Sequence, residues 1–70
     1  MRLKHCNKGD LVWVHDPYAD AIVHVKVDGP YVDEQYRVKG IKVLFEDGMF
    51  CSYDIMDFNE PCWKTKPTNL

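Results

Sequence analysis

The clearest pattern in the chain is the alternation of apolar and polar residues in short segments. Every second residue of segment 21–27 is apolar, namely Ala21, Val23, Val25 and Val27. A period of two is typical of a β-strand with one buried face. Segments 11–15 (LVWVH) and 41–45 (IKVLF) are rich in β-branched and aromatic residues, which strands favour. The pattern therefore predicts three strands in the first two thirds of the chain.

Turn-forming residues separate these strands and predict the remaining elements. The predicted turns contain KGD at 8–10, DPYAD at 16–20, DGP at 28–30 and EDG at 46–48. Residues 30–35 are expected to form a long loop, and Gly40 is expected to mark a bulge. Further along, the sequence predicts a fourth strand at 49–53, one helical turn at 54–58 with Asp54 as its N-cap, and a fifth strand at 62–64.

This order of elements predicts an all-β fold. Five short antiparallel strands in about 60 residues favour a small, bent, SH3-like barrel, because closure removes exposed strand edges. One short helical turn is expected before the last strand. We expect an N-terminal arm at 1–7, the barrel at 8–65 and a C-terminal tail at 66–70.

Composition and charge narrow the function classes. With 70 residues, 46% of them hydrophobic and 29% charged, the chain has the composition of a single globular domain. Its formal net charge of −2 argues against general nucleic-acid binding, which needs an excess of lysine and arginine. No apolar run is long enough to span a membrane, and the N-terminus lacks the apolar core of a signal peptide. We therefore expect an intracellular protein without a membrane partner.

The cysteines and histidines indicate neither a metal centre nor a catalytic one. Three cysteines without a CxxC pair make a poor disulfide framework, so buried or half-buried free thiols are expected. A zinc site from His5, Cys6 and Cys62 is a weak alternative, because the close ligand spacing of structural zinc sites is missing. Cys51 and His24 do not suggest a nucleophile and base, since a small barrel lacks a deep pocket. We expect no catalytic residue, metal or cofactor.

The segments KGDLV (8–12), AIVHVKV (21–27) and VLFEDG (43–48) together resemble the Tudor and hybrid-Tudor branch of the SH3-like barrels. The resemblance covers roughly residues 8–58. It implies a non-catalytic module that recognises a basic peptide or protein segment at the open end of the barrel. The segment is either methylated or unmodified. A methylated histone tail is the sharpest form of this expectation.

Tudor readers hold a methylated cation within several aromatic rings, through cation–π attraction. The resemblance places Phe45 at one wall, Phe50 at another and Asp47 beside the cation. His15 stands where hybrid-Tudor readers have tryptophan, and Ala21 or Ile22 stands where they have tyrosine. The expected ligand-binding residues are Tyr18, Phe45, Phe50, Asp47, Trp13 and His15.

Each ring also has a structural interpretation. Trp13 lies inside a strand, where a large ring most often fills the core, and Phe45 suits core or cage equally. Trp63 is expected to cover the barrel as a lid. Two further functions stay open: a small stand-alone phage or bacterial protein that docks on a larger complex, and a weak nucleic-acid binder.

Overall fold

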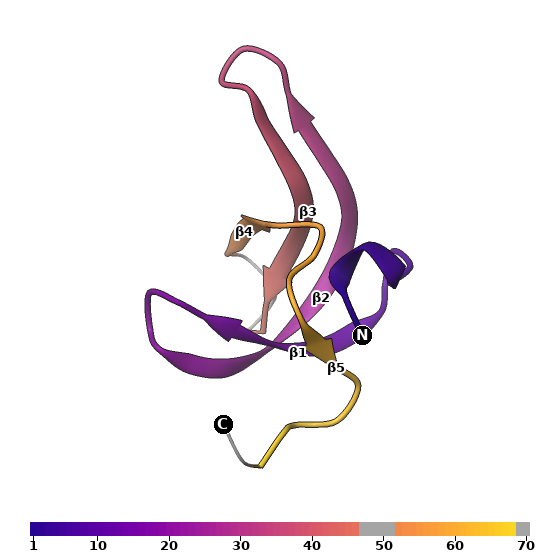
Figure 1. Ribbon diagram of the computed structural model, residues 1–70, viewed down its shortest axis with the longest axis vertical. Helices are drawn as coiled ribbons and strands as arrows, with labels where there is room; N and C mark the ends of the chain where they lie inside the picture. The colour runs from indigo at the N-terminus through magenta and orange to yellow at the C-terminus, as the bar shows by residue number, and fades with distance from the viewer. Residues whose placement is uncertain (47–51, 69–70) are drawn as a thin grey trace.

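The computed structural model describes residues 1–46 and 52–68. In this part of the chain, five antiparallel strands form one sheet in the order β4-β3-β2-β1-β5 (Figure 1). A short 3-10 helix, η1 (Leu3–His5), precedes strands β1 (Leu11–Asp16), β2 (Ala21–Asp33), β3 (Val38–Phe45), β4 (Tyr53–Met56) and β5 (Cys62–Trp63). The predicted all-β class is confirmed.

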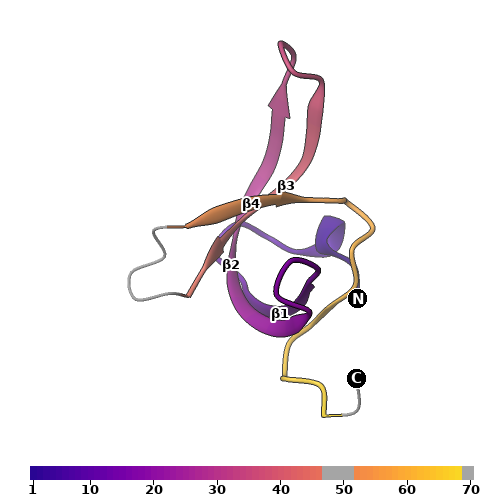
Figure 2. The same ribbon diagram turned by 90° about the vertical axis from the view of Figure 1, so that its left-hand side faces the viewer.

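The sheet is strongly bent but not closed. β4 and β5 are the two end strands of the order, and no pairing joins them in the described residues. Figures 1 and 2 show that the curvature is concentrated in β2, whose first half pairs with β1 and whose second half rises with β3. A closed SH3-like barrel is therefore not confirmed.

A bulge bends β2 and makes its hairpin with β3 project from the body of the sheet (Figure 2). The pairing shifts between Val27 and Gly29, so that Asp28 is an extra residue. Gly29 has a φ of 116°, a conformation that residues with a side chain rarely adopt. The predicted loop at 30–35 is wrong, because β2 continues to Asp33 and the turn occupies 34–37.

The predicted bulge at Gly40 is wrong as well, and this glycine has a different role. Gly40 keeps its pairing with Tyr31 in the ladder. A Cβ built at Gly40 would lie 2.3 Å from the carbonyl oxygen of Met56 on β4. Glycine is needed here because the β4 backbone comes too close for any side chain.

The predicted helical turn at 54–58 is also wrong. Tyr53–Met56 is strand β4, paired with β3 from Leu44 to Ile41. The Asp54 carboxylate accepts a hydrogen bond from the Ile55 N–H rather than capping a helix. The chain turns only after β4, where the Glu60 N–H donates to the Asp57 carbonyl oxygen. Pairing with β3 thus decides the local structure.

The core lies on one face of the bent sheet. Its buried residues are Leu3, Val12, Val14, Val25, Val27, Ile41, Val43, Met56 and Cys62, with Cys6, Val23, Phe45 and Phe58 packed against them. Burial of so many apolar side chains supplies the main driving force for folding. Leu3 comes from the predicted N-terminal arm, whose backbone bonds to residues 58–62 through pairs such as Leu3 N–H and the Glu60 carbonyl oxygen, 3.0 Å apart.

No helix in the described residues is long and apolar enough to cross a membrane.

Candidate binding site

Rings from three strands lie in a row on the face of the sheet opposite the core. Trp13 on β1 pairs directly with His24 on β2 and with Trp63 on β5. Directly paired residues project from the same face of a sheet. Their neighbours Val12, Val14 and Val25 point the other way, into the core. Trp13 is therefore half-buried on the outer face. The interpretation of Trp13 as a core residue is wrong.

Trp13 and His24 make a stacked pair at the centre of this row. Their ring centroids are 4.5 Å apart and their planes differ by 15°. His24 Nδ1 also lies 2.5 Å from the Glu46 carboxylate, at the end of β3. The carboxylate and the indole together fix the orientation of the imidazole between them.

The C-terminal segment places a cation over the same indole. The ammonium nitrogen of Lys66 lies 5.5 Å from the centroid of the Trp13 ring. This distance is within the range in which an aromatic ring attracts a cation. Lys64, two residues earlier, pairs instead with Asp10 at 3.6 Å. Trp13 is thus a ring that accepts a lysine side chain from the segment after β5.

A groove opens beside these rings, and we call it the Trp13 groove. Its volume is about 460 Å³, and its described lining consists of Trp13, Asp16, Ile22, Val23, His24, Phe45 and Glu46. The groove lies beside the end of β3. The last residue of β3, Phe45, pairs with Val25, so the first residues of β2 extend past the end of β3. The lining combines apolar walls with two carboxylates and contains no lysine or arginine among the described residues.

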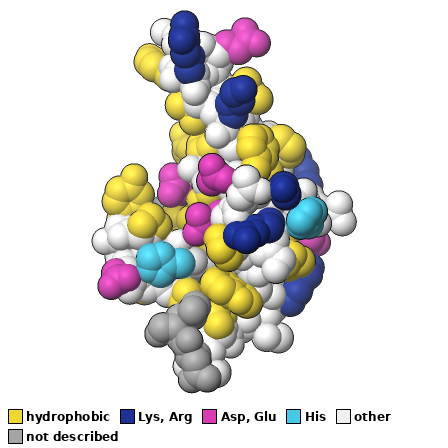
Figure 3. Space-filling model, viewed as in Figure 1, with side chains coloured by type: hydrophobic (Ala, Val, Ile, Leu, Met, Phe, Trp, Pro, Cys, Tyr) yellow, Lys and Arg dark blue, Asp and Glu magenta, His cyan; other side chains and the backbone are white. Residues whose placement is uncertain are grey.

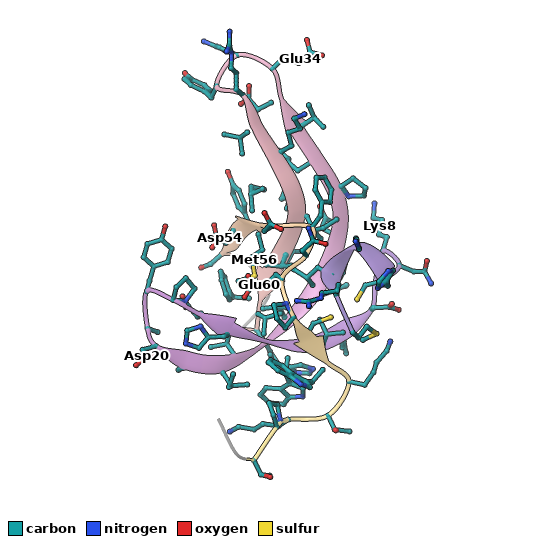
Figure 4. All side chains as sticks on the ribbon, viewed as in Figure 1. Lys8, Asp20, Glu34, Asp54, Met56 and Glu60 are labelled. Atoms are coloured by element: carbon teal, nitrogen blue, oxygen red, sulfur yellow. The ribbon has the colours of Figure 1, made fainter. Side chains whose placement is uncertain are left out.

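A second, smaller groove lies on the other side of the β1–β2 turn, and we call it the acidic groove. Its volume is about 200 Å³, and it is lined by Pro17, Tyr18, Asp54, Ile55, Met56, Asp57 and Glu60. Figure 4 shows Asp54, Met56 and Glu60 near one another, on β4 and the segment after it. Figure 3, drawn in the same view as Figure 4, shows acidic side chains close together in the middle of the molecule. Asp16 and Pro17 are adjacent in sequence, so the two grooves share the base of the turn.

The structure distributes the predicted site residues rather than gathering them into a cage. Trp13 and Phe45 line the Trp13 groove, with Phe45 also packed against the core. Tyr18 is 90% exposed and lines the acidic groove. His15 lines neither groove, and its Nε2 lies 3.0 Å from the Asp20 carboxylate. The predicted residues Asp47 and Phe50 lie outside the described residues, and an aromatic cage is not confirmed.

The Asp16 carboxylate already has local partners. It accepts hydrogen bonds from the backbone N–H of Tyr18, at 2.9 Å, and of Ala19, at 3.4 Å. Such bonds stabilise the turn that presents Tyr18. Asp16 therefore shapes the boundary between the two grooves while adding negative charge to it.

Sequence reasoning missed His24, Trp63 and Lys66 as members of the site. A signal for His24 was present: a four-residue turn at 17–20 pairs Asp16 with Ala21, and the same register pairs Trp13 with His24. The pairing of Trp63 had no such signal, because β5 joins β1 from the far end of the chain. Lys66 was assigned to an unstructured tail.

The cysteines that the structure describes do not belong to a metal cluster. No group of three or more His, Cys, Asp or Glu side chains is arranged to hold a metal within residues 1–46 and 52–68. Cys6 and Cys62 are free thiols whose sulfur atoms lie 3.6 Å apart.

Comparisons of the chain with protein-family models, with curated proteins and with solved structures find no match to any of them.

Proposed function

We propose that this protein is a non-catalytic binding module for a basic peptide or protein segment, which lies across the Trp13 groove and reaches the acidic groove. The observation that carries the proposal is the ammonium group of Lys66 over the Trp13 ring. A lysine from a binding partner would make the same contact with the indole. Because a ring attracts a cation through its electron-rich face, this contact requires no cage.

The charge of the two grooves supports a basic ligand. Glu46 borders the Trp13 groove, and Asp54, Asp57 and Glu60 border the acidic groove. A ligand with several lysine or arginine residues would place one cation on Trp13 and others beside these carboxylates. Complementary charges of this kind mainly favour encounter and orientation.

The apolar walls support a ligand in extended conformation. Ile22, Val23 and Phe45 line the Trp13 groove along the start of β2. On the side of β2 that faces β3, the Glu46 N–H donates to the His24 carbonyl oxygen at 3.2 Å. An extended segment would pack its side chains along the apolar walls beyond this bond.

Methylation of the lysine should have a modest effect. A methylated ammonium is more weakly hydrated and gains more from contact with an aromatic face. Among the described residues, however, one indole face takes the place of the several rings of a cage. We therefore propose that the basic character of the ligand matters more than its methylation.

Calorimetric titration with a lysine-rich peptide tests the proposal. The test is made in a Lys66→Ala background, where the chain's own Lys66 cation no longer occupies the ring. There Trp13→Leu keeps an apolar side chain but removes the ring, and it should weaken binding roughly two- to thirtyfold, as loss of one cation–π contact predicts. Tyr36→Ala is the matched control, because Tyr36 is a 70% exposed ring on the distant hairpin turn. Equal binding with and without Trp13→Leu in the Lys66→Ala background, or equal binding of an acidic peptide, would reject the proposal.

A further inference from the structure

Two thiols from opposite ends of the chain meet in the core. Cys6 follows η1, and Cys62 opens β5, yet their sulfur atoms are in contact at 3.6 Å. Cys62 is 1% exposed, and Cys6 is half-buried beside it. A disulfide bond is about 2.05 Å long, so the two sulfur atoms need to approach by only about 1.5 Å.

Backbone hydrogen bonds on both sides hold the two thiols in place. The Cys62 N–H donates to the Met1 carbonyl oxygen at 2.9 Å, and the Cys6 N–H donates to the Leu3 carbonyl oxygen at 3.0 Å. Arg2 and Pro61 form an additional β-bridge between the two segments. The N-terminal segment and β5 are thus aligned before any bond forms.

From this geometry we propose that Cys6 and Cys62 are a cross-linking site, which a small-molecule disulfide such as oxidised glutathione converts to an intramolecular disulfide. This inference is independent of the peptide-binding function. The cysteine pattern of the sequence, a poor disulfide framework with buried or half-buried thiols, does not predict this pair.

The reaction proceeds by two exchanges. The Cys6 thiolate attacks one sulfur of the small disulfide, which forms a mixed disulfide on Cys6 and releases one thiolate. The Cys62 thiolate then attacks the Cys6 sulfur, which forms the Cys6–Cys62 bond and releases the second thiolate. The two cysteines lose two electrons and two protons, and the small disulfide becomes two thiols. Cys6 reacts first because it is the more exposed of the two.

Burial and the neighbouring Cys6 thiol raise the pKa of Cys62 from 9.0 to about 11. Because only the thiolate attacks, the second exchange should be the slower one at neutral pH. Mildly alkaline solution therefore suits the experiment.

The test uses the Cys51→Ser variant, which keeps only the two cysteines of the pair. After incubation with oxidised glutathione under native conditions, the chain should lose both titratable thiols and the mass of two hydrogen atoms, with no covalent link between chains. A peptide map without reductant should recover Cys6 linked to Cys62. Closure of so long a loop should lower the unfolding equilibrium constant by up to about a thousandfold.

Three results would overturn the proposal: two thiols that stay titratable, a reaction that stops at the mixed disulfide on Cys6, or a link between two chains. Cys6→Ala in the Cys51→Ser background is the control. It keeps Cys62 alone and should show neither the mass loss nor the gain in stability.

Discussion

At the residue scale, Trp13 is the central residue of the proposed site, because it lies in the middle of a row of rings across three strands. Its position opposite His24 and Trp63 follows from strand register, and its exposure follows from the alternation of β1, in which Val12 and Val14 take the core positions. A ring that is half-buried by its neighbours is already oriented before a ligand arrives. Such preorganisation reduces the entropy that binding costs.

Cys62 makes stability depend on pH in the alkaline range. Its pKa is about 11 in the folded chain against 9.0 for an unperturbed thiol, so ionisation favours the unfolded state. The contribution is complete below pH 9 and should be lost as pH rises towards 11, by roughly 2 kcal/mol. Urea unfolding of the reduced protein measures it.

The Cys62→Ala variant separates this effect from the titration of tyrosine and lysine in the same range. It should be less stable at neutral pH, but its stability should fall less steeply above pH 9. Parallel stability curves for the two proteins would show that Cys62 is not responsible.

Gly40 should tolerate no side chain. In Gly40→Ala the new Cβ would lie 2.3 Å from the Met56 carbonyl oxygen, which is backbone and cannot rotate away. We expect a loss of about 3 kcal/mol in the free energy of unfolding, measured by urea denaturation. Gly29→Ala is the comparison. A Cβ built at Gly29 has no atom within 4 Å outside the neighbouring residues of the chain, so only the positive φ is unfavourable. Its cost should be about 1 kcal/mol, and the opposite ranking would contradict this account.

At the element scale, the C-terminal segment after β5 would compete with the proposed basic ligand for the Trp13 ring. Lys66 reaches this ring because β5 pairs beside β1 and delivers the following residues to the outer face. A basic partner must therefore displace Lys66 before it can bind.

Removal of the Lys66 cation should therefore strengthen binding. Lys66→Ala should raise the affinity for a lysine-rich peptide roughly two- to fivefold, the value of one exposed cation–π contact. Lys64→Ala is the matched control, because Lys64 pairs with Asp10 rather than with Trp13. Calorimetry measures both. Weaker binding by Lys66→Ala, or an equal gain in both variants, would show that the segment does not compete.

The elements also show how far sequence reasoning extends. The alternation in segment 21–27, and the β-branched and aromatic residues of segments 11–15 and 41–45, predicted β1, β2 and β3. The helical turn at 54–58 was wrong, since Asp54 suits a helix cap locally but pairing with Val43 places it in a strand. The site was only half predictable. Trp13 and Phe45 were named and the short β1–β2 turn could have added His24, whereas Trp63 and Lys66 depend on the pairing of β5 from the far end of the chain.

At the scale of the whole molecule, the stability of the fold and the proposed binding depend largely on different parts of the open sheet. The core on one face and the backbone contacts of the N-terminal segment stabilise the fold. The outer face carries the row of rings beside the Trp13 groove. The acidic groove includes Asp54 and Met56, which share a face with the core residues Val43 and Ile41 that they pair with. The projecting β2–β3 hairpin lies away from both grooves, so it provides an internal reference in any binding experiment (Figure 1).

The most direct test of the binding site is chemical-shift mapping with a lysine-rich peptide and its trimethyl-lysine form. The account predicts that both peptides shift the indole N–H of Trp13 and the amide signals of His24 and Glu46, with at most a severalfold difference in affinity. The hairpin signals of residues 32–38 should stay in place. Shifts confined to the hairpin, or none with either peptide, would contradict the account.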